Sequence, residues 1–244
     1  TGMTTYYADL HVPPAASPVG RSSLEAPAAA GARAGLQALA ITDHDLCTPV
    51  PPEIGGVLLI PGCEISTRAG HITGLFLDKP VDLAALGHLP EPEAAVAAIR
   101  KAGGLAVLAH PFQRAGRSEA DYAFPLDGAE AVNARACFKN PAANEQAAVF
   151  AAKRSLVPVG GSDAHDAKEV GNACTALEAQ ALTLPALREA LAAGRCAPIL
   201  RRHTPHIRKG LSQWTKARRR GGAYGLCRAA AYVGYCAILD IFRR

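Results

Sequence analysis

Short apolar runs recur along the chain, and several of them end at a histidine or an aspartate. Three of the runs, at residues 6–11, 38–44 and 105–110, finish with a histidine. A fourth run leads through two glycines into Asp163 and His165. Apolar runs of this length between turn residues predict short buried strands. Because four such strands end in side chains that can hold metal ions, the pattern predicts one shared polar cavity.

Strand and helix signals alternate over the first 200 residues. Strands are predicted at residues 6–11, 38–42, 57–60, 72–77, 105–109, 129–133 and 156–159. Helices, which mostly start near a proline or a capping side chain and end near a glycine, are predicted at residues 22–35, 92–103, 140–154 and 183–194. This alternation is typical of a mostly parallel α/β sheet. Seven strands over so short a span favour a barrel over an open sheet.

In a parallel barrel, the side chains that carry chemistry lie at the carboxyl ends of the strands. Most candidate polar residues follow a predicted strand by a few positions and are expected at this mouth. His71 precedes its strand instead, and it reaches the same mouth if residues 66–70 form a tight return into an antiparallel strand. The residues expected at the mouth are His11, Asp43, His44, Glu64, His71, His110, Asn133, Asp163 and His165.

These residues offer a mixed set of metal ligands. The candidate ligands are five imidazoles and two carboxylates: His11, His44, His71, His110 and His165 with Glu64 and Asp163. Mixed nitrogen and oxygen donors suit Mn²⁺, Zn²⁺ or Fe²⁺. Seven donors exceed the needs of one tetrahedral ion, so we expect two or three divalent ions with a carboxylate bridging two of them. Asp43 is expected to orient a ligand imidazole.

Short motifs follow one another along the chain in an order that is itself informative. They are Asp9-Leu10-His11-Val12, Thr42-Asp43-His44-Asp45, Pro61 to Ser66 with His71-Ile72, Ala109-His110-Pro111-Phe112, Asn133, Gly161 to His165, and Val170-Gly171-Asn172 with Thr175. In this order they resemble the PHP (polymerase and histidinol phosphatase) domain family over about 170 residues. The resemblance implies a distorted barrel of seven β/α units with a trinuclear metal site. It also implies a phosphoesterase that acts on small phosphate monoesters, including nucleotides and histidinol phosphate.

By motif position, the resemblance divides the ligands among three ions. The first ion would be held by His11, Glu64 and Asp163. Glu64 would bridge to a second ion, which His71 and His110 would complete. All the ligands of this second ion are present in the sequence.

The first and third ions lack expected ligands. The resemblance gives the third ion His44 and His165. Pro13 stands where the family has the second histidine of its first motif, and Val19 stands where a ligand of the third ion is usual. Neither side chain can coordinate a metal. We therefore expect a weak or absent third ion and a weakened first ion.

The leading hypothesis is a metal-dependent phosphoesterase that hydrolyses a small phosphate monoester through a metal-activated hydroxide. Its expected catalytic residues are Asp43, Glu64 and Asp163. The alternative hypothesis is a degenerate, non-catalytic PHP domain that binds a ligand or a partner. The replacements at Pro13 and Val19 motivate this alternative.

Cationic side chains near the mouth are candidates for binding the substrate phosphate. Arg114 follows one predicted strand, and Arg135 and Lys139 follow another. Arginine suits this role because its guanidinium group can pair bidentately with phosphate oxygens. The expected partner is thus a small phosphorylated substrate, and no stable nucleic-acid complex is expected.

Charge divides the chain into a body and a basic tail. Residues 1–200 carry 15 basic and 20 acidic side chains, whereas residues 201–244 carry 11 basic side chains and one acid, Asp240. We therefore expect a PHP-type domain at 1–200 and a basic, helical extension at 201–244. The uncharged stretch 229–239 is short of the ~20 residues that span a bilayer. Three alternatives stay open for the tail, namely docking on the barrel, an interfacial helix on anionic lipid and a nucleic-acid contact, and docking is favoured.

Cysteine usage and the first residues bear on location. The seven cysteines are widely spaced and form no CxxC pair, so they indicate neither a disulfide framework nor a zinc knuckle. No signal-peptide pattern is found near the N-terminus. A cytoplasmic location is the expectation, and no pattern predicts an oligomeric state.

Metal analysis tests the expected loss of ligands. Protein purified without added metal should hold fewer than three tightly bound ions per chain. Losing a residue that only orients a ligand typically lowers metal affinity by about 10–100-fold. Losing a direct ligand should lower the affinity by more. Mass spectrometry of the metals gives the ratio of metal to protein. Three tightly bound equivalents would contradict the prediction.

Overall fold

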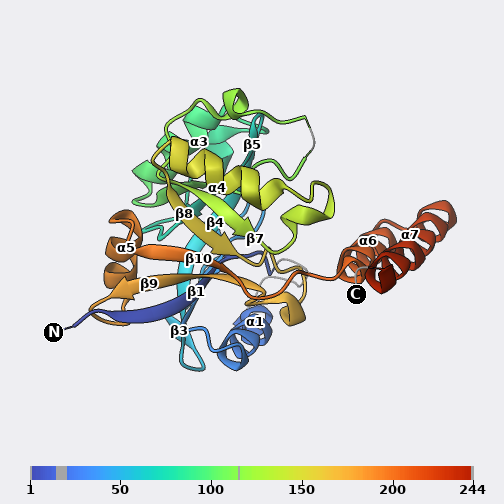
Figure 1. Ribbon diagram of the computed structural model, residues 1–244, viewed down its shortest axis with the longest axis horizontal. Coiled ribbons are helices and arrows are strands. Elements are labelled where there is room, and N and C mark those ends of the chain that lie inside the picture. The colour runs from blue at the N-terminus through green and yellow to red at the C-terminus, as the bar shows by residue number, and fades with distance from the viewer. Residues whose placement is uncertain (1, 15–20, 115, 243–244) are drawn as a thin grey trace. The chain divides into compact units, whose positions relative to one another are not determined.

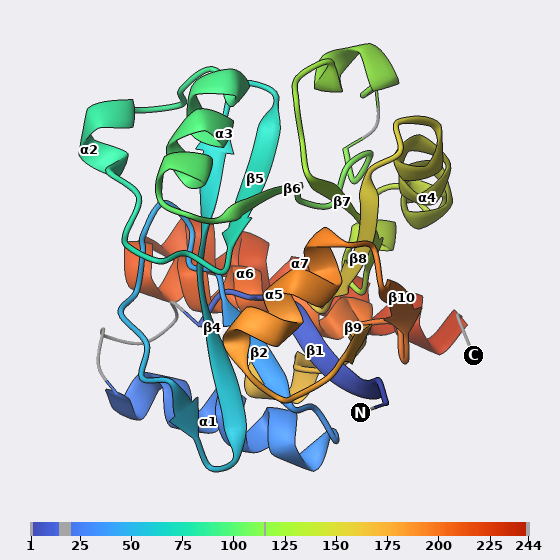
Figure 2. The same ribbon diagram turned by 90° about the vertical axis from the view of Figure 1, so that its left-hand side faces the viewer.

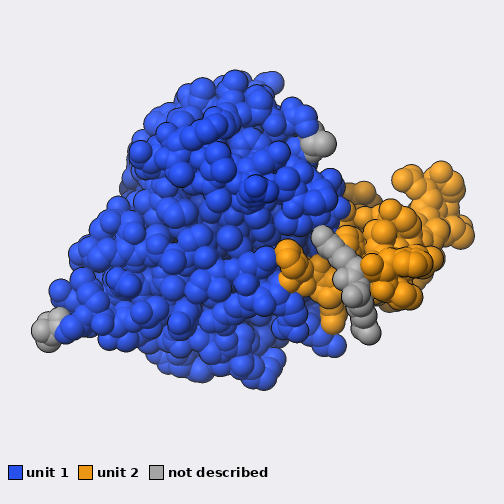
Figure 3. All heavy atoms as spheres, viewed as in Figure 1, with its two compact units in different colours: residues 1–202 blue, residues 203–244 orange. Residues whose placement is uncertain are grey.

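The computed structural model describes residues 2–14, 21–114 and 116–242. They form two compact units, residues 1–202 and residues 203–244, which Figure 3 colours separately. Unit 1 contains the β-sheet with its covering helices. Unit 2 consists of two helices, α6 (His206–Arg220) and α7 (Ala223–Phe242).

One sheet runs through the described part of unit 1 (Figures 1 and 2). Its ten strands are β1 (Thr4–Val12), β2 (Ala38–Ile41), β3 (Glu53–Ile54), β4 (Val57–Thr67), β5 (Gly70–Leu75), β6 (Leu105–Leu108), β7 (Gly128–Asn133), β8 (Val157–Gly161), β9 (Ala173–Ala179) and β10 (Cys196–Leu200). They follow the order β10-β9-β1-β2-β4-β5-β6-β7-β8, and β3 pairs with β4. The end strands β8 and β10 pack against each other, so the sheet curls into a nearly closed barrel. The expected α/β barrel is confirmed.

Helices cover the outside of this barrel. Those of unit 1 are α1 (Arg21–Arg33), α2 (Leu83–Leu86), α3 (Pro92–Lys101), α4 (Ala143–Lys153) and α5 (Leu184–Ala192). Short 3₁₀ helices lie in the connections, at η1 (Glu119–Tyr122), η2 (Ala136–Phe138) and η3 (Ala167–Glu169). α3 packs on β5 and β6, α4 lies along β7, and α5 packs on β9 (Figure 1). The apolar faces of strands and helices thereby bury three hydrophobic clusters.

The strands β4 and β5 form an antiparallel hairpin. Thr67 pairs with Gly70 across it, and the Thr67 hydroxyl donates to the Gly70 carbonyl oxygen at 2.7 Å. The chain therefore turns back within four residues, and His71 lies opposite Ser66. This tight return and the antiparallel strand confirm the expectation for residues 66–70.

Some elements differ from the apolar pattern. The pattern does not predict β3, β9 or β10, although β9 pairs antiparallel with both β1 and β10. The expected helix at 140–154 begins later, at Ala143. The cause is local, because the Asn140 side chain accepts the N–H of Ala142 at 3.1 Å and donates to the carbonyl oxygen of Phe112 at 2.9 Å. These bonds form a turn before the helix.

Two glycines at the end of β8 permit a close approach to β1 and β9. A Cβ atom added to Gly161 would lie 2.4 Å from the Cβ of His11 and 2.7 Å from Oε1 of Glu130. A Cβ atom added to Gly160 would lie 2.5 Å from the carbonyl oxygen of Cys174. Such distances are too short for any other residue. The glycine pair is therefore a steric condition for closing the barrel at this point.

Asp9 ties β1 to two distant loops. Its buried carboxylate accepts the N–H of Ser162 through Oδ1 and the N–H of Gly171 through Oδ2, both at 2.9 Å. Burial raises the pKa of Asp9 to about 6, while the hydrogen bonds from Ser162 and Gly171 act to lower it. The carboxylate thereby fixes the loop after β8 relative to β1.

Replacing this carboxylate should loosen the barrel. Asp9→Asn leaves one acceptor oxygen, so one of the two backbone N–H groups loses its partner inside the protein. We expect a loss of roughly 1–3 kcal/mol in the free energy of unfolding, measured by urea denaturation. Asp82→Asn is the matched control, since Asp82 is an exposed helix cap and asparagine caps helices equally well. Equal losses in the two variants would contradict the anchoring role.

Candidate metal centre

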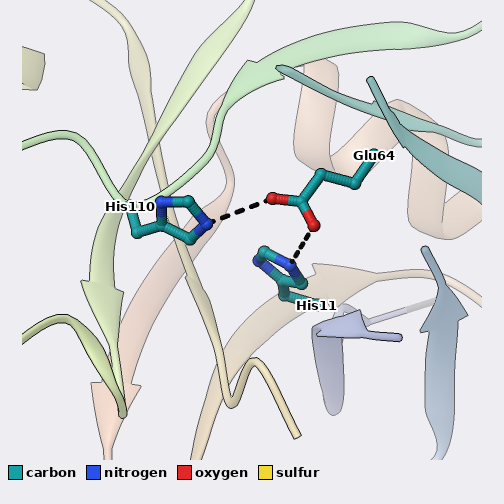
Figure 4. Close-up of side chains that lie close together, drawn as sticks. All are labelled: His11, Glu64 and His110. Atoms are coloured by element: carbon teal, nitrogen blue, oxygen red, sulfur yellow. Dashed lines mark hydrogen bonds and ion pairs between the residues drawn. The ribbon is translucent and has the colours of Figure 1, made fainter. Parts of the chain in front are cut away.

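One buried carboxylate forms the middle of the candidate site. Glu64, on β4, is fully buried. Its Oε2 lies 3.2 Å from Nε2 of His11 and 2.9 Å from Nδ1 of His44. Its Oε1 lies 2.9 Å from Nδ1 of His71 and 3.1 Å from Nε2 of His110. Figure 4 shows the carboxylate between the rings of His11 and His110. Four of the predicted histidine ligands therefore contact the predicted carboxylate ligand Glu64.

Irregular backbone brings these side chains to Glu64. The pairing of β1 with β2 shifts register between Asp9 and Val12, which is the bulge that contains His11. Bulges of this kind re-aim a side chain beside an active site. His110 follows β6 with a φ of 30°, in the left-handed region that few non-glycine residues adopt. The loop residue His44 forms an isolated parallel bridge with Glu64.

A second buried carboxylate, Glu130 on β7, supports the first. Its Oε1 lies 3.1 Å from Nδ1 of His11, and its Oε2 accepts the backbone N–H of His110 at 2.7 Å and the amide of Asn133 at 3.0 Å. The sequence patterns do not predict this residue as part of the site. One glutamate within a mostly apolar strand could have indicated it. A buried charge needs a partner, so such a glutamate is expected to contact a polar site.

The two nitrogens of His11 face carboxylates on opposite sides. A neutral imidazole carries one N–H, and Nδ1–H donating to Glu130 leaves the lone pair of Nε2 directed toward Glu64. Two lone pairs repel unless a cation lies between them or the ring takes a second proton. Burial acts to lower the pKa of His11, but Glu130, Glu64 and Asp163 outweigh it and hold the pKa well above its ordinary value.

The donor set fits divalent metal ions. Within the described residues, two groups bring their ligating atoms within 4.8 Å of one another, and they are His11, Glu64 and His110, and His44, Glu64 and His71. Glu64 belongs to both groups, as a bridging carboxylate does in two-metal sites. A carboxylate behind a ligand imidazole, as Glu130 is behind His11, is the usual arrangement at metal centres. The division of ligands implied by the resemblance instead groups His110 with His71, and it stays a prediction.

Asp163 and His165 lie beside this cluster. Asp163 has a φ of 54°, and its N–H donates to the carbonyl oxygen of His11 at 2.9 Å. Its Oδ1 lies 3.9 Å from Nε2 of His11. Nδ1 of His165 lies 2.9 Å from the Asp163 carbonyl oxygen, so Nδ1–H donates there and Nε2 is available to a metal. Burial lowers the pKa of His165, with the raising effect of Asp163 and the further lowering effect of Arg135 behind it.

The remaining metal-related positions are placed as follows. Asp43 is buried and accepts a hydrogen bond from the Thr48 hydroxyl. Its carbonyl oxygen accepts the N–H of Glu64 at 3.0 Å, so it borders the cluster through the backbone. Pro13 is buried and lines a cavity of about 230 Å³ together with His165. Val19 lies outside the described residues.

A cavity with three arginines opens beside the cluster. It has a volume of about 310 Å³, and His71 and His110 form part of its wall. Arg114, a predicted phosphate ligand, lines it together with Arg68 and Arg117, which the sequence patterns do not predict. Arg68 directly follows the last residue of β4, within the tight return. The return was predicted from the sequence, and it could have indicated that Arg68 lies near His71.

The other two predicted phosphate ligands lie elsewhere. Arg135 is buried, and its Nη1 donates to Oε2 of Glu169 at 2.5 Å. The same oxygen accepts the N–H of His165 at 3.1 Å, so this ion pair holds the loop of His165. Lys139 is exposed and follows η2. A phosphate-binding role for Arg135 and Lys139 stays a prediction.

The charged cluster predicts how stability depends on pH in the metal-free protein. Burial acts to lower the pKa values of His11, His44 and His110. Their contacts with carboxylates have a larger effect, so all three pKa values lie above the ordinary 6.5. The folded state therefore binds more protons than the unfolded state above that pH. The stability that these histidines contribute is fully present below about pH 6.5 and is lost as the pH rises through the raised values.

Urea denaturation of chelator-treated protein measures this dependence. We expect the free energy of unfolding to fall as the pH rises above about 6.5, and Glu64→Gln to flatten the fall because it removes the shared charge. Added Mn²⁺ should reverse the slope, since ligand imidazoles must lose their protons to bind a metal. The same fall in Glu64→Gln as in the natural chain would contradict the assignment to this cluster.

Parts of the chain resemble known proteins in sequence. A family model described as PHP-associated matches residues 141–196. An uncharacterised protein of Methanocaldococcus jannaschii is 34% identical over 107 residues, which are 41% of this chain and 60% of that protein. The chain thus spans less than two thirds of this relative.

Solved structures share the fold at low sequence identity. A two-domain Bacteroides vulgatus protein containing a predicted PHP-like metal-dependent phosphoesterase aligns with a TM-score of 0.61 and 21% identity, over 82% of this chain and 66% of that one. PsfC from Pseudomonas syringae aligns with a TM-score of 0.60 and 18% identity, over 97% and 100%. The lesion-specific endonuclease Q of Pyrococcus furiosus aligns with a TM-score of 0.55 and 15% identity, over 78% and 56%. The chain is thus similar to the PHP-associated family over residues 141–196, and it shares the fold of a protein that contains a predicted PHP-like phosphoesterase.

Proposed function

We propose that the protein is a metal-dependent phosphoesterase that hydrolyses a small phosphate monoester at the Glu64 cluster. The observation that carries the proposal is one fully buried carboxylate contacted by four imidazoles, His11, His44, His71 and His110. An arginine-lined cavity shares His71 and His110 with this cluster. The fold shared with a protein that contains a predicted PHP-like metal-dependent phosphoesterase supports the same reaction class.

The residues of the chain divide the work between holding metal and binding phosphate. When bound, divalent ions at such a cluster lower the pKa of water and offset charge on phosphoryl oxygens. Glu130 orients His11 by accepting its Nδ1–H, and it fixes the backbone beside His110. Arg114 would bind the phosphate from the cavity wall. Arg68 and Arg117 line the same cavity, where they also pair with Glu91 at 2.9 Å and Asp121 at 3.9 Å. The cavity of about 310 Å³ suits the remainder of a small substrate.

A second candidate function is ligand binding without turnover. The buried Pro13 beside His165 favours it, because proline offers no ligand where the family has a histidine. In this case the cluster would hold metal and phosphate but would lack one ion needed for catalysis. The variant Pro13→His separates the two functions, since it should raise turnover if the barrel is otherwise competent.

A phosphatase screen with Mn²⁺ tests the proposal. Nucleoside monophosphates, nucleoside bisphosphates and histidinol phosphate are the substrates, and release of inorganic phosphate is the readout. Glu64→Gln should lower kcat/KM by more than about 100-fold, because it changes the ligand shared by both groups. Glu130→Gln should cost about 10–100-fold, because the amide can still contact His11 but no longer carries charge. Glu145→Gln, on the exposed side of α4, is the matched control.

The outcomes separate the hypotheses. Turnover that depends on Glu64 supports the phosphoesterase. Activity equal to that of Glu64→Gln on every substrate, with phosphate still bound in calorimetry, would favour the non-catalytic domain. Cleavage of duplex DNA but of no monoester would move the substrate class toward that of endonuclease Q, a fold neighbour that has been seen with a lesion-containing duplex.

A further inference from the structure

Unit 2 is a helical hairpin with its own internal bonds. Gly221 and Gly222 connect α6 to α7 with φ values of 73° and 94°. The carboxylate of Asp240, near the end of α7, accepts the N–H groups of His206 at 2.7 Å and Ile207 at 2.8 Å. These are the first residues of α6, so the two helices run antiparallel side by side.

The two helices touch over their middle parts as well. A Cβ atom added to Gly210 on α6 would lie 3.0 Å from the Cα of Val233 and 3.3 Å from the Cβ of Cys236 on α7. Ala229 and Cys236 are accordingly the buried residues of α7. The hairpin therefore behaves as one body, and α7 cannot move far without α6.

The opposite side of α7 is apolar and exposed. Tyr224, Tyr235, Ile238, Ile241 and Phe242 are between 52% and 85% exposed. The spacing of Tyr224, Tyr235, Ile238 and Phe242, with the exposed Ala231, places these positions on one stripe at helical periodicity, and Ile241 lies beside it. Only 11% of the most apolar stretch of α7 is buried within the described structure. An exposed apolar stripe of this length marks an interaction surface.

The partner helix α6 is strongly basic. It carries six basic side chains and no acidic one: Arg208, Lys209, Lys216, Arg218, Arg219 and Arg220. Over residues 203–244 the sequence holds nine basic residues and one acid, a net charge of +8. The partner must therefore accept apolar side chains and positive charge at once.

We propose that unit 2 binds the surface of a membrane rich in anionic phospholipid, with the hairpin lying in the interface. The apolar stripe of α7 enters the boundary of the acyl chains, and the lysines and arginines of α6 contact lipid phosphates. Tyrosine and tryptophan side chains favour this boundary, and the hairpin holds Tyr224, Tyr235 and the only tryptophan of the chain, Trp214.

Other binding modes match either the apolar stripe of α7 or the basic charge of α6, but not both. α7 is long and apolar enough to cross a bilayer by length and composition. A crossing helix, however, would carry the charges of α6 into hydrocarbon, because Asp240 and Gly210 hold α6 along it. Nucleic acid would neutralise α6 but leave the stripe of α7 in water. A second copy would cover the stripe but bring two units of charge +8 together.

Vesicle flotation of the full chain tests the proposal. The probes are vesicles of phosphatidylcholine alone and vesicles of equal parts phosphatidylcholine and phosphatidylglycerol. We expect flotation with the second kind only, release at high salt, and a shift of Trp214 emission to shorter wavelength on binding. Equal behaviour with both kinds of vesicle, or no flotation with either, would overturn the proposal.

Two variants test which residues act. Tyr235→Asp with Ile238→Asp should lower the affinity for anionic vesicles by more than about tenfold, and so should reversal of charge at Arg218, Arg219 and Arg220. Val149→Asp is the matched control, since Val149 is a comparably exposed apolar residue of unit 1. Circular dichroism verifies that each variant is folded.

Three results would overturn the proposal. The first is that Tyr235→Asp with Ile238→Asp floats as well as the natural chain. The second is a dimer, seen by light scattering, that this variant dissolves while the natural chain does not bind vesicles. The third is tight binding of duplex DNA without vesicle binding, which would assign the basic helix to nucleic acid.

Discussion

The barrel depends on neutralising one carboxylate that has no contact with water. Burial acts to raise the pKa of Glu64, yet the surrounding imidazoles, His11 foremost, hold the pKa well below its ordinary range. Those imidazoles come from β1, from the loop after β2, from β5 and from the end of β6. Since a lone buried charge is prohibitively costly, these segments must all arrive together. The site and the closed barrel are therefore the same structural solution.

The backbone is irregular at several positions whose side chains surround Glu64 or support its ligands. β1 bulges at His11, β7 shifts register between Glu130 and Val132, and His110 and Asp163 adopt left-handed backbone. Such conformations cost free energy and persist only where their surroundings determine them. Here the hydrogen bonds of Glu130 to His110 and of Asp163 to His11 supply that support.

The sequence predicted the parts of the site that each strand carries locally. His11, Glu64 and His110 were recognisable because an apolar run precedes each of them at short range. Glu130 was not recognisable, because its role depends on its contact with His11, which is 119 positions away in the sequence. β9 was missed for a related reason, since its residues gain their pairing only from β1 and β10. Arg135 shows the reverse case, in which a cation near the mouth is held by a buried glutamate that no local pattern reveals.

The pairing of β1 also determines when the molecule can fold. β1 lies beside β9, and Asp9 reaches N–H groups that are 153 and 162 positions further along the chain. Contacts of such long range are slow to form because a large loop must close first. During synthesis, β1 can pair early with β2, but it waits for almost all of unit 1 to emerge before it pairs with β9. Nascent chains of this protein are exposed to aggregation until that late step.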